Sequence, residues 1–416
     1  MRYDGDHGES FLLPAGAQEI FARVERAGGE CFLVGGAVRD VLLGKAPDDL
    51  DLAVSLPPDE IAALFGDCRL ILTGEKHGTV GVFSGDAVYE VTTFRRDGEY
   101  KDARRPESVS FTRSLTEDLR RRDFTVNAMA WSERTGLCDP FGGEKDLREK
   151  TLRAVGDPRI RFGEDALRIL RLARFASVLG FSPEEKTRLA AEELAPTLAL
   201  VSGERIAEEL RKLFRGKRAC ASLSGLPEIR RTLFGDFHLP PALPGDFAAA
   251  LALIFRGRKK ELEDFARLRR LSSREREEAL LLEGELSRPP LAEGEGSRRD
   301  ALRLLGRIGP GLAGKLVAAR EAAGEEDGLG AIRAALASGI PFRVTDLAVR
   351  GDELEKETGA SGAALGKLLR SLLEDVTAGI LPNEKTALIE SARERSTNHE
   401  NDHAGHGTRE FHRDPV

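Results

Sequence analysis

Two carboxylates placed two residues apart, Asp49 and Asp51, constrain what this chain can fold into more than any other feature of its sequence. They accompany an apolar stretch over residues 50–56 that predicts a strand. Side chains two apart on a strand project from the same face. Two carboxylates held side by side repel each other and cost stability unless a cation lies between them. The pair therefore predicts a cation-binding site on this strand.

A glycine pair lies shortly before these carboxylates. An apolar run at residues 31–34 is typical of a buried strand and ends at Gly35 and Gly36, and a helix is expected to begin near Ala37. A Gly-Gly turn that opens a helix offers bare backbone N–H groups to phosphate oxygens. Each pattern alone is common in ordinary turns and solvated strand edges. Their succession within about twenty residues predicts a site for a metal-bound nucleoside triphosphate.

Residues 32–55 resemble the first motif of the polymerase-β-like nucleotidyltransferases, in the class that adds CCA to tRNA or adenylate tails to RNA. The resemblance continues at residues 118–128, which are similar to the second motif of that family, and at residues 163–175, which are similar to its EDxxR motif. It implies an α+β fold class, with a mixed β-sheet and helices in a small nucleotidyltransferase head. An extended all-α neck, body and tail would follow.

The pattern of the chain changes once, from strand-like apolar runs before about residue 140 to helical periodicity beyond about residue 150. Strands are expected at residues 70–72, 79–83, 87–93 and 128–131, and the best linker candidate is residues 288–299. The predicted domains are a nucleotidyltransferase catalytic head at 1–150, a helical neck with a nucleobase-recognition helix at 151–222, a helical body at 223–335, a helical tRNA-binding tail at 336–395 and a disordered polar C-terminus at 396–416.

The resemblance also implies roles for particular residues in catalysis. Asp49 and Asp51 are expected to hold two Mg²⁺ ions, which is the chemistry of two-metal phosphoryl transfer. Glu90 either supplies a third metal-binding carboxylate or faces solvent on its strand. The triphosphate is expected to lie against the glycine pair, with two arginines on its oxygens, and these nucleotide-binding residues are Gly35, Gly36, Arg39 and Arg122.

The remaining predicted residues contact the ribose and the base. Asp123 would accept a hydrogen bond from the ribose 2′-OH. Asp165 and Arg168 would read the base, and Arg171 and Arg174 would complete the pocket. If residues 163–175 form one helix, Asp165, Arg168 and Arg171 would share one of its faces. A carboxylate and an arginine together match the exocyclic amine and ring acceptor of cytosine and adenine, so CTP and ATP are the expected substrates, whereas UTP and GTP would leave polar groups unpaired.

The expected function is template-independent, Mg²⁺-dependent addition of CCA to the 3′ end of tRNA. The loop at residues 97–106 resembles the loop of enzymes that add the terminal A, so an enzyme that adds only A to a CC end is the alternative. A poly(A) polymerase ranks third, and a non-catalytic RNA-binding protein is the reading from another class. DNA polymerases and antibiotic-type nucleotidyltransferases are disfavoured by the second and EDxxR motifs. Because the chain has no HD-type metal motif, an attached phosphohydrolase domain is not expected.

Charge and composition bound the partners and the location. The formal net charge of -7 does not exclude RNA, because arginines cluster locally, as at residues 211–218. The expected RNA contacts are the 3′ end and the acceptor and T-arm of tRNA, and no membrane partner is expected because no apolar stretch of eighteen residues occurs. Four scattered cysteines favour reduced thiols and a cytoplasmic location. The expected oligomeric state is a monomer or a dimer.

Overall fold

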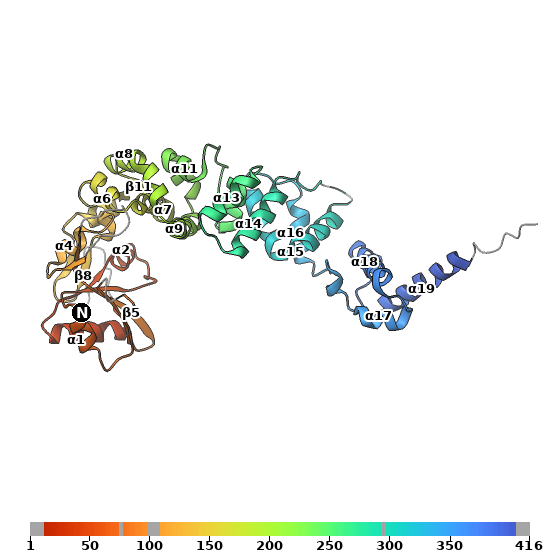
Figure 1. The fold of residues 1–416 in the computed structure, drawn as a ribbon, viewed down its shortest axis with the longest axis horizontal. Coiled ribbons are helices and arrows are strands. Elements are labelled where there is room, and N and C mark those ends of the chain that lie inside the picture. The colour runs from red at the N-terminus through yellow and green to blue at the C-terminus, as the bar shows by residue number, and fades with distance from the viewer. Residues whose placement is uncertain (1–11, 75–77, 99–108, 293, 295, 405–416) are drawn as a thin grey trace, which may run out of the picture. The chain divides into compact units, whose positions relative to one another are not determined.

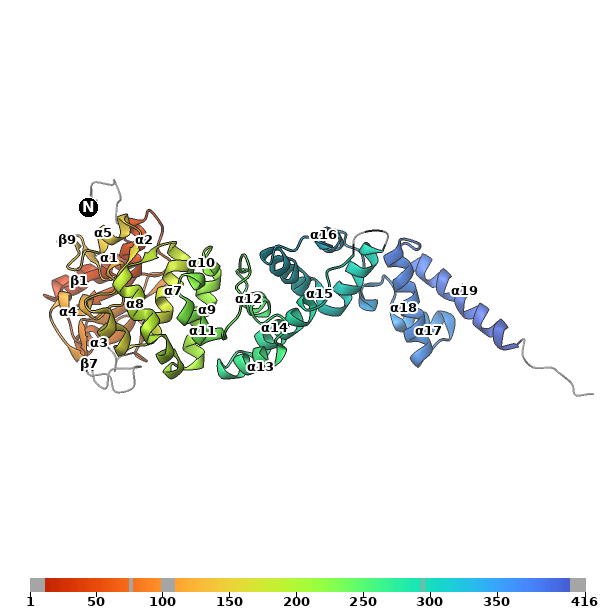
Figure 2. The same ribbon diagram turned by 90° about the horizontal axis from the view of Figure 1, so that it is seen from above.

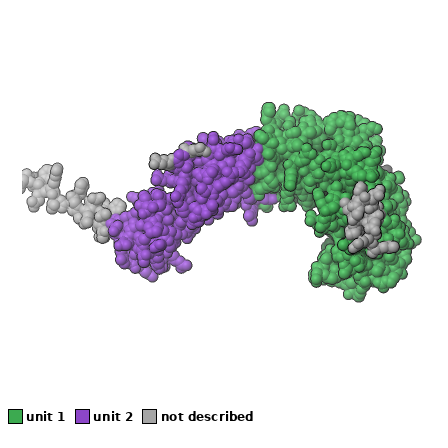
Figure 3. All heavy atoms as spheres, turned by 180° about the vertical axis from the view of Figure 1, so that it is seen from behind, with its two compact units in different colours: residues 1–250, 263–273 green, residues 251–262, 274–416 purple. Residues whose placement is uncertain are grey.

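The computed structural model describes residues 12–74, 78–98, 109–292, 294 and 296–404, and it is seen from two directions in Figure 1 and Figure 2. The chain forms two compact units, coloured separately in Figure 3. Unit 1 consists of residues 1–250 and 263–273, and unit 2 consists of residues 251–262 and 274–416. The predicted division into head, neck, body and tail is finer than this and stays a prediction.

Among the described residues, unit 1 contains a seven-stranded sheet in the order β3-β4-β5-β2-β1-β8-β9. Neighbouring strands are antiparallel except β2 and β5, which are parallel. Every residue of β1 is buried, which explains why this strand is a continuous apolar run. The strands of this sheet are β1 (Cys31–Val34), β2 (Asp51–Val54), β3 (Leu70–Ile71), β4 (Thr79–Ser84), β5 (Ala87–Thr93), β8 (Ala130–Ser132) and β9 (Gly136–Cys138).

Two further strand pairs and a set of helices complete unit 1. Helix α7 packs against α9 and α10. The pairs are β6 (Arg95–Asp97) with β7 (Val109–Phe111), and β10 (Thr151–Leu152) with β11 (Ser182–Pro183). The helices are α1 (Ala15–Arg26), α2 (Gly36–Leu42), α3 (Pro58–Leu64), α4 (Leu115–Arg120), η2 (Thr125–Asn127), α5 (Gly143–Arg148), α6 (Pro158–Glu164), α7 (Leu167–Leu179), α8 (Glu185–Leu194), η3 (Ala195–Leu200), α9 (Gly203–Arg215), α10 (Ala219–Ser224) and α11 (Pro227–Phe234). Helices α12 (Phe247–Ile254) and α13 (Lys259–Leu268) include residues of both units.

The predicted α+β fold class is confirmed, and so are the strands expected over residues 79–83 and 87–93. The prediction that both carboxylates lie on one strand was wrong. Strand β2 begins at Asp51, so Asp49 lies in the loop before it. In the register of the sheet, Asp51 is the first paired residue of β2 and lies opposite Glu90 of β5.

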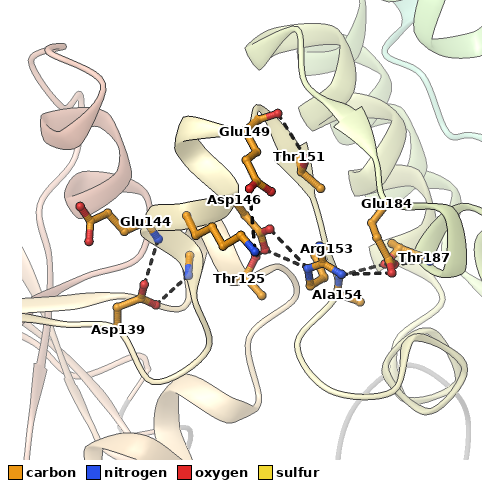
Figure 4. A network of polar contacts seen from close by, with 12 residues as sticks. Thr125, Asp139, Glu144, Asp146, Glu149, Thr151, Arg153, Ala154, Glu184 and Thr187 are labelled. Carbon is orange, nitrogen blue, oxygen red and sulfur yellow. Dashed lines mark hydrogen bonds and ion pairs between the residues drawn. The ribbon is translucent and has the colours of Figure 1, made fainter.

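A network of polar contacts joins the sheet-containing part of unit 1 to the helices that follow it (Figure 4). At its centre is Asp146 of α5, which is 3% exposed and accepts hydrogen bonds from Thr125 Oγ1 at 2.6 Å and from Arg153 Nε at 3.1 Å. Arg153 also forms an ion pair with Glu184, which accepts a hydrogen bond from the backbone N–H of Thr187 in α8. The network therefore links α5 and η2 to α8.

Removing the central carboxylate of this network should destabilise unit 1. We expect Asp146→Ala to lower the free energy of unfolding by about 2–3 kcal/mol, because the buried Thr125 hydroxyl loses its acceptor and Arg153 keeps only its ion pair with Glu184. Urea denaturation can be followed through the fluorescence of Trp131, the only tryptophan of the chain. As a control, Glu149→Ala removes an exposed carboxylate nearby and should cost less than about 0.5 kcal/mol. Equal losses in the two variants would contradict this role.

Unit 2 is helical throughout its described residues. Helix α15 is kinked where Gly309, with φ +80°, precedes Pro310, because proline has no N–H to continue the helical ladder. A small separate core of Leu and Val side chains holds α17, α18 and α19 together. The elements are α14 (Ser273–Leu286), α15 (Ser297–Ala322), α16 (Leu329–Ala337), η4 (Val344–Asp346), α17 (Gly351–Thr358), α18 (Gly362–Ala378) and α19 (Lys385–Ala404).

Several expectations concern termini, membranes and thiols. Helix α19 includes residues 396–404, which the sequence assigned to a disordered C-terminus, and residues 405–416 lie outside the described residues. None of the helices in the described part of the chain is both long and apolar enough to span a bilayer. The four cysteines Cys31, Cys68, Cys138 and Cys220 are free thiols.

Candidate active site

A cavity of about 630 Å³ in unit 1 brings the predicted residues together. Its wall is formed by the β1–α2 turn, the loop before β2, the segment between α4 and η2, the α6–α7 junction and one face of α9. Every predicted site residue except Glu90 lines this cavity, namely Gly35, Gly36, Arg39, Asp49, Asp51, Arg122, Asp123, Asp165, Arg168, Arg171 and Arg174.

The glycine turn places backbone against an arginine. Gly35 has φ +70°, a backbone conformation that residues with a side chain rarely adopt. A Cβ atom at this position would lie 2.6 Å from Arg122 Nη1. The positive φ restricts this position to glycine, and the absence of a Cβ atom lets Arg122 lie close to the turn. Arg39, on α2, donates from Nε and Nη2 to the carboxylate of Asp40 and from Nη1 to Asn127 Oδ1. Arg39 of α2 and Arg122 of the segment between α4 and η2 thus bring two guanidinium groups to the cavity wall beside the glycine turn.

The two metal-site carboxylates both reach the cavity, Asp49 from a loop and Asp51 from the first position of β2. Desolvation by the cavity wall raises the pKa of Asp51, although part of its surface faces the open cavity. Arg122 opposes this shift, and the like charge of Asp49 adds to it. The like-charge repulsion predicted from the sequence is therefore present despite the loop position of Asp49.

Glu90 is the register partner of Asp51 in the parallel β2–β5 pair, but it is exposed and does not line the cavity. No three His, Cys, Asp or Glu side chains of the described residues are grouped so that they could hold a metal ion. Mg²⁺ commonly binds through one or two carboxylates and takes its other ligands from water and substrate phosphates. The pair Asp49 and Asp51 fits such a site, and the role of Glu90 as a third ligand stays a prediction.

Asp123 lies at the floor of the cavity and is 7% exposed. Its carboxylate accepts hydrogen bonds from Asn127 Nδ2 at 3.0 Å and from Arg171 Nε at 2.7 Å. Burial alone would raise the pKa of Asp123, but Arg171, Asn127 and the backbone N–H of Phe124 hold it well below its ordinary value. Asp123 is therefore an ionised acceptor at neutral pH.

Two arginines of α7 share a second buried carboxylate, Glu209 of α9. Arg174 donates from Nε to Glu209 at 2.7 Å, and its guanidinium stacks 3.5 Å from the ring centroid of Phe175. Burial and the neighbouring Arg171 lower the pKa of Arg174, and Glu209 partly offsets this. For Arg171, Asp123 and Glu209 more than compensate burial and raise its pKa. The carboxylates thus allow two adjacent cations to face the cavity.

The single helix expected over residues 163–175 was wrong. Helix α6 ends at Glu164, Asp165 is extended with φ −142° and ψ 103°, and α7 begins at Leu167. The break has a local cause, because Asp165 Oδ1 accepts a hydrogen bond from the backbone N–H of Leu167 and so competes with helical pairing. The prediction that the apolar side chains of this segment turn into the core is confirmed, since Leu167 and Phe175 are buried.

Arg168 is buried rather than solvated, with 8% of its surface exposed. Its Nη1 donates to the carbonyl oxygen of Arg161 and to Glu164, and its Nη2 donates to the carbonyl oxygen of Arg121. Arg168 and Asp165 both line the cavity, but each is held by a different partner, because Asp165 Oδ2 accepts from Arg205 Nη2 at 2.8 Å.

Sequence reasoning missed several residues of the cavity wall. Arg205 and Lys212 of α9 line the cavity, and Glu209 of the same helix binds the two arginines of α7. Glu209 lies four residues after Arg205 and three before Lys212, a spacing that puts all three on one face of the helix. That spacing is visible in the sequence but is common on solvated helices. The other lining residues that were not predicted are Ala37, Asp40, Asp48, Arg121, Asn127, Leu167 and Phe175.

Two family models match the chain. Residues 31–153 match the poly A polymerase head domain, and residues 180–229 match the probable RNA and SrmB-binding site of polymerase A. These ranges include the glycine turn, the carboxylate pair and the α9 face.

Individual relatives agree with the family models. The chain is 35% identical over 399 residues to a CCA-adding enzyme of Lactobacillus delbrueckii subsp. bulgaricus, covering 90% of this chain and 96% of that protein. It is 50% identical over 209 residues to a CCA-adding enzyme of Geobacillus thermodenitrificans, a match that covers 50% of this chain and spans about half, 51%, of that protein. The solved structure of the Bacillus stearothermophilus CCA-adding enzyme in complex with CTP is similar with a TM-score of 0.71 and 31% identity, covering 94% of this chain and 100% of that one.

Proposed function

The chain belongs to the CCA-adding enzymes of the class II nucleotidyltransferases, and from that membership we propose that it adds C, C and A to the 3′ end of tRNA, using CTP and ATP and releasing pyrophosphate. The observation that carries the proposal is one cavity that holds a carboxylate pair, a glycine turn and a set of arginines beside Asp165. The CTP complex of a 31% identical relative supports a nucleotide as the ligand of this cavity. A cytoplasmic location stays a prediction.

Asp49 and Asp51 would hold Mg²⁺, with Glu90 as a candidate third ligand for a two-ion site. The metal supplies Lewis-acid stabilisation of charge at the reacting phosphorus and on the leaving pyrophosphate. The chain's own residues orient the triphosphate. The N–H group of Gly36 and the guanidiniums of Arg39 and Arg122 are donors for its oxygens, whereas the N–H of Gly35 already donates to the carbonyl oxygen of Met129. Holding both reactants in line lowers the entropic part of the barrier.

The other side of the cavity would bind the nucleoside. Asp123 would accept a hydrogen bond from the ribose 2′-OH at Oδ2, beside the bond from Arg171, because Oδ1 already accepts from the backbone N–H of Phe124 and from Asn127. Asp165 accepts from the exocyclic amine of cytosine or adenine, and Arg168 donates to a ring acceptor. Glu164 and two carbonyls occupy three of the five N–H groups of Arg168, and the N–H of Nε and the second N–H of Nη2 are the donors that would serve the base.

We also propose the division into head, neck, body and tail, with the tail at 336–395 as the part that contacts the acceptor and T-arm of tRNA. The small core shared by α17, α18 and α19 supports a tail that keeps its own shape.

The alternative is an enzyme that adds only the terminal A to tRNA ending in CC, and a poly(A) polymerase ranks third. The loop at residues 97–106, which distinguishes A addition in the resemblance, lies mostly outside the described residues, as does part of the 73–79 segment that favours a tRNA substrate. A non-catalytic RNA-binding protein is disfavoured by the carboxylate pair, because it would repel phosphate without a metal.

Nucleotide addition to three RNAs decides between these activities. The substrates are tRNA lacking CCA, tRNA ending in CC and an unstructured RNA, each with CTP, ATP and Mg²⁺, and products are resolved at single-nucleotide length. We expect two C additions and one A addition on the first tRNA, and one A addition on the second. The controls are tRNA that already ends in CCA and reactions with excess EDTA, and neither should give product.

The other outcomes each favour a competing activity. Addition only to the CC-ended tRNA would make the chain an A-adding enzyme that needs a CC-adding partner. Long A tails on the unstructured RNA would make it a poly(A) polymerase. RNA binding without pyrophosphate release would leave only a binding function.

A further inference from the structure

The aromatic ring of Phe175 is surrounded by three guanidinium groups of the cavity wall. Phe175 of α7 lines the cavity and is 3% exposed. The Cζ atom of Arg174 lies 3.5 Å from the centroid of this ring, and the Cζ atoms of Arg171 and Arg39 lie 5.2 Å and 5.4 Å from it. All three arginines line the same cavity. Each lies within about 6 Å, the distance at which the negative face of an aromatic ring attracts a cation.

The position of this ring is fixed by the core behind it. Phe124, which is fully buried, packs edge to face against Phe175 with the ring centroids 5.7 Å apart. Arg171 and Arg174 reach the ring from α7, whereas Arg39 reaches it from α2. The ring is therefore a fixed point at which arginines of two separate helices meet.

The ring holds these cations in a way that a carboxylate cannot. Guanidinium groups gathered at one place repel one another. Each of the three is also paired with a carboxylate, and such a pair cancels charge that would attract a phosphate group. An aromatic ring attracts a cation through its quadrupole and carries no net charge. The ring of Phe175 thus stabilises the three guanidinium groups without lowering their positive charge.

Arg174 shows which donors this arrangement leaves for a ligand. Its Nε donates to Glu209 at 2.7 Å, and its planar face lies on the ring of Phe175. Its Nη1 and Nη2 atoms form no hydrogen bond to any residue that the structure describes. Two terminal nitrogens of one guanidinium match two oxygens of a phosphate group. Arg174 is therefore oriented by one edge and one face, and its remaining edge is left for an anion.

We propose that Phe175 is a positioning residue for the nucleotide, whose ring holds three guanidinium groups as a preformed binding site for the oxygens of the triphosphate. The inference rests on the proposed function and adds to it a residue that has no polar side-chain atom. Groups that are held in their binding geometry before the ligand arrives lose less entropy when it binds. Because CTP and ATP carry the same triphosphate, the ring should affect the binding of both equally and leave the choice of base unchanged.

The test weakens the negative face of the ring with little change in its shape. Phe175 is replaced in the full chain by phenylalanine analogues that carry one, two or three ring fluorines, which withdraw electron density from the face in steps. We expect the Kd of CTP and of ATP, measured with Mg²⁺ and without tRNA, to rise with each fluorine and to reach about fivefold or more with three. The Kd of inorganic pyrophosphate should rise in parallel. The ratio of kcat/KM for CTP over UTP should stay unchanged.

The matched control is a second arginine and phenylalanine pair outside the cavity. The Cζ atom of Arg69 lies 4.7 Å from the ring centroid of Phe83, and neither residue lines the cavity. The same analogues at Phe83 should leave all three Kd values unchanged. Phe175→Leu keeps an apolar side chain in the core but has no aromatic face. Once its Tm has shown that it folds, it should raise the Kd of CTP at least as much as three fluorines do.

Two results would overturn the proposal. One is a Kd for CTP that stays constant along the fluorine series at Phe175 or changes equally at Phe83. The other is a loss of affinity for CTP that ATP and pyrophosphate do not share, because the ring would then act on the nucleoside. The failure of the proposed function is recognised separately, because the wild-type chain would then bind CTP but add no nucleotide to tRNA.

Discussion

Asp49→Ala and Asp51→Ala should each lower the rate of nucleotide addition by on the order of a thousandfold or more. Either change removes half of the carboxylate pair at the cavity wall and, with it, the charge that would hold Mg²⁺ against the triphosphate. The measurement is single-turnover addition of C to tRNA lacking CCA, at saturating Mg²⁺.

The thermal stability of Asp49→Ala and Asp51→Ala should not fall with their activity. Desolvation and the like charge of Asp49 raise the pKa of Asp51, so Asp49→Ala relieves repulsion and its Tm should equal or exceed that of the wild type. Asp51→Ala relieves the same repulsion but removes a counter-charge of the buried Arg122, so its Tm should stay close to that of the wild type. Loss of activity combined with an unchanged or higher Tm is the signature of a functional carboxylate pair. A structural aspartate would lose both together.

A control carboxylate lies on the same sheet. Asp86→Ala alters an exposed residue in the β4–β5 turn, outside the cavity, and should leave the rate unchanged. Activity of Asp49→Ala or Asp51→Ala within about tenfold of the wild type would contradict the assignment of these residues to the metal site.

Truncating the proposed base-reading pair, Asp165 and Arg168, should have the second-largest effect. It should lower the selectivity between nucleotides rather than the affinity for RNA. We expect Asp165→Ala and Arg168→Ala to lower the preference for CTP over UTP and for ATP over GTP by about a hundredfold. A site built to hydrogen-bond its ligand rejects a mismatched base because buried polar groups are left unpaired, and truncation removes that penalty.

Arg168 also has a structural role that the measurement must separate. Its guanidinium bonds to the carbonyls of Arg161 and Arg121, so its loss will destabilise the α6–α7 junction. The ratio of misincorporation to correct incorporation is insensitive to the amount of folded enzyme and is therefore the decisive readout. Arg159→Ala, which removes an exposed arginine of α6, should leave the ratio unchanged. Intact selectivity with weaker tRNA binding would show that Arg168 contacts RNA instead.

Much of the fold could be predicted because its signals are local. The buried strand β1, the glycine turn and the strand at residues 87–93 depend on residues within one element, and each lies where the sequence predicts it. The family resemblance then identified residues from distant segments that line one cavity. Local signals failed at Asp165, where a side-chain hydrogen bond to the Leu167 N–H breaks an otherwise helical pattern.

The glycine turn and the carboxylate pair could thus be predicted from neighbouring residues, and the other candidate site residues from the family resemblance. Their partners could not. The pairing of Asp165 with Arg205, of Arg171 with both Asp123 and Glu209, and the loop position of Asp49 were decided only when the chain folded. These contacts join residues 38 to 48 positions apart, and they depend on how α9 and α7 pack and on where β2 finds its partners, which no local pattern encodes.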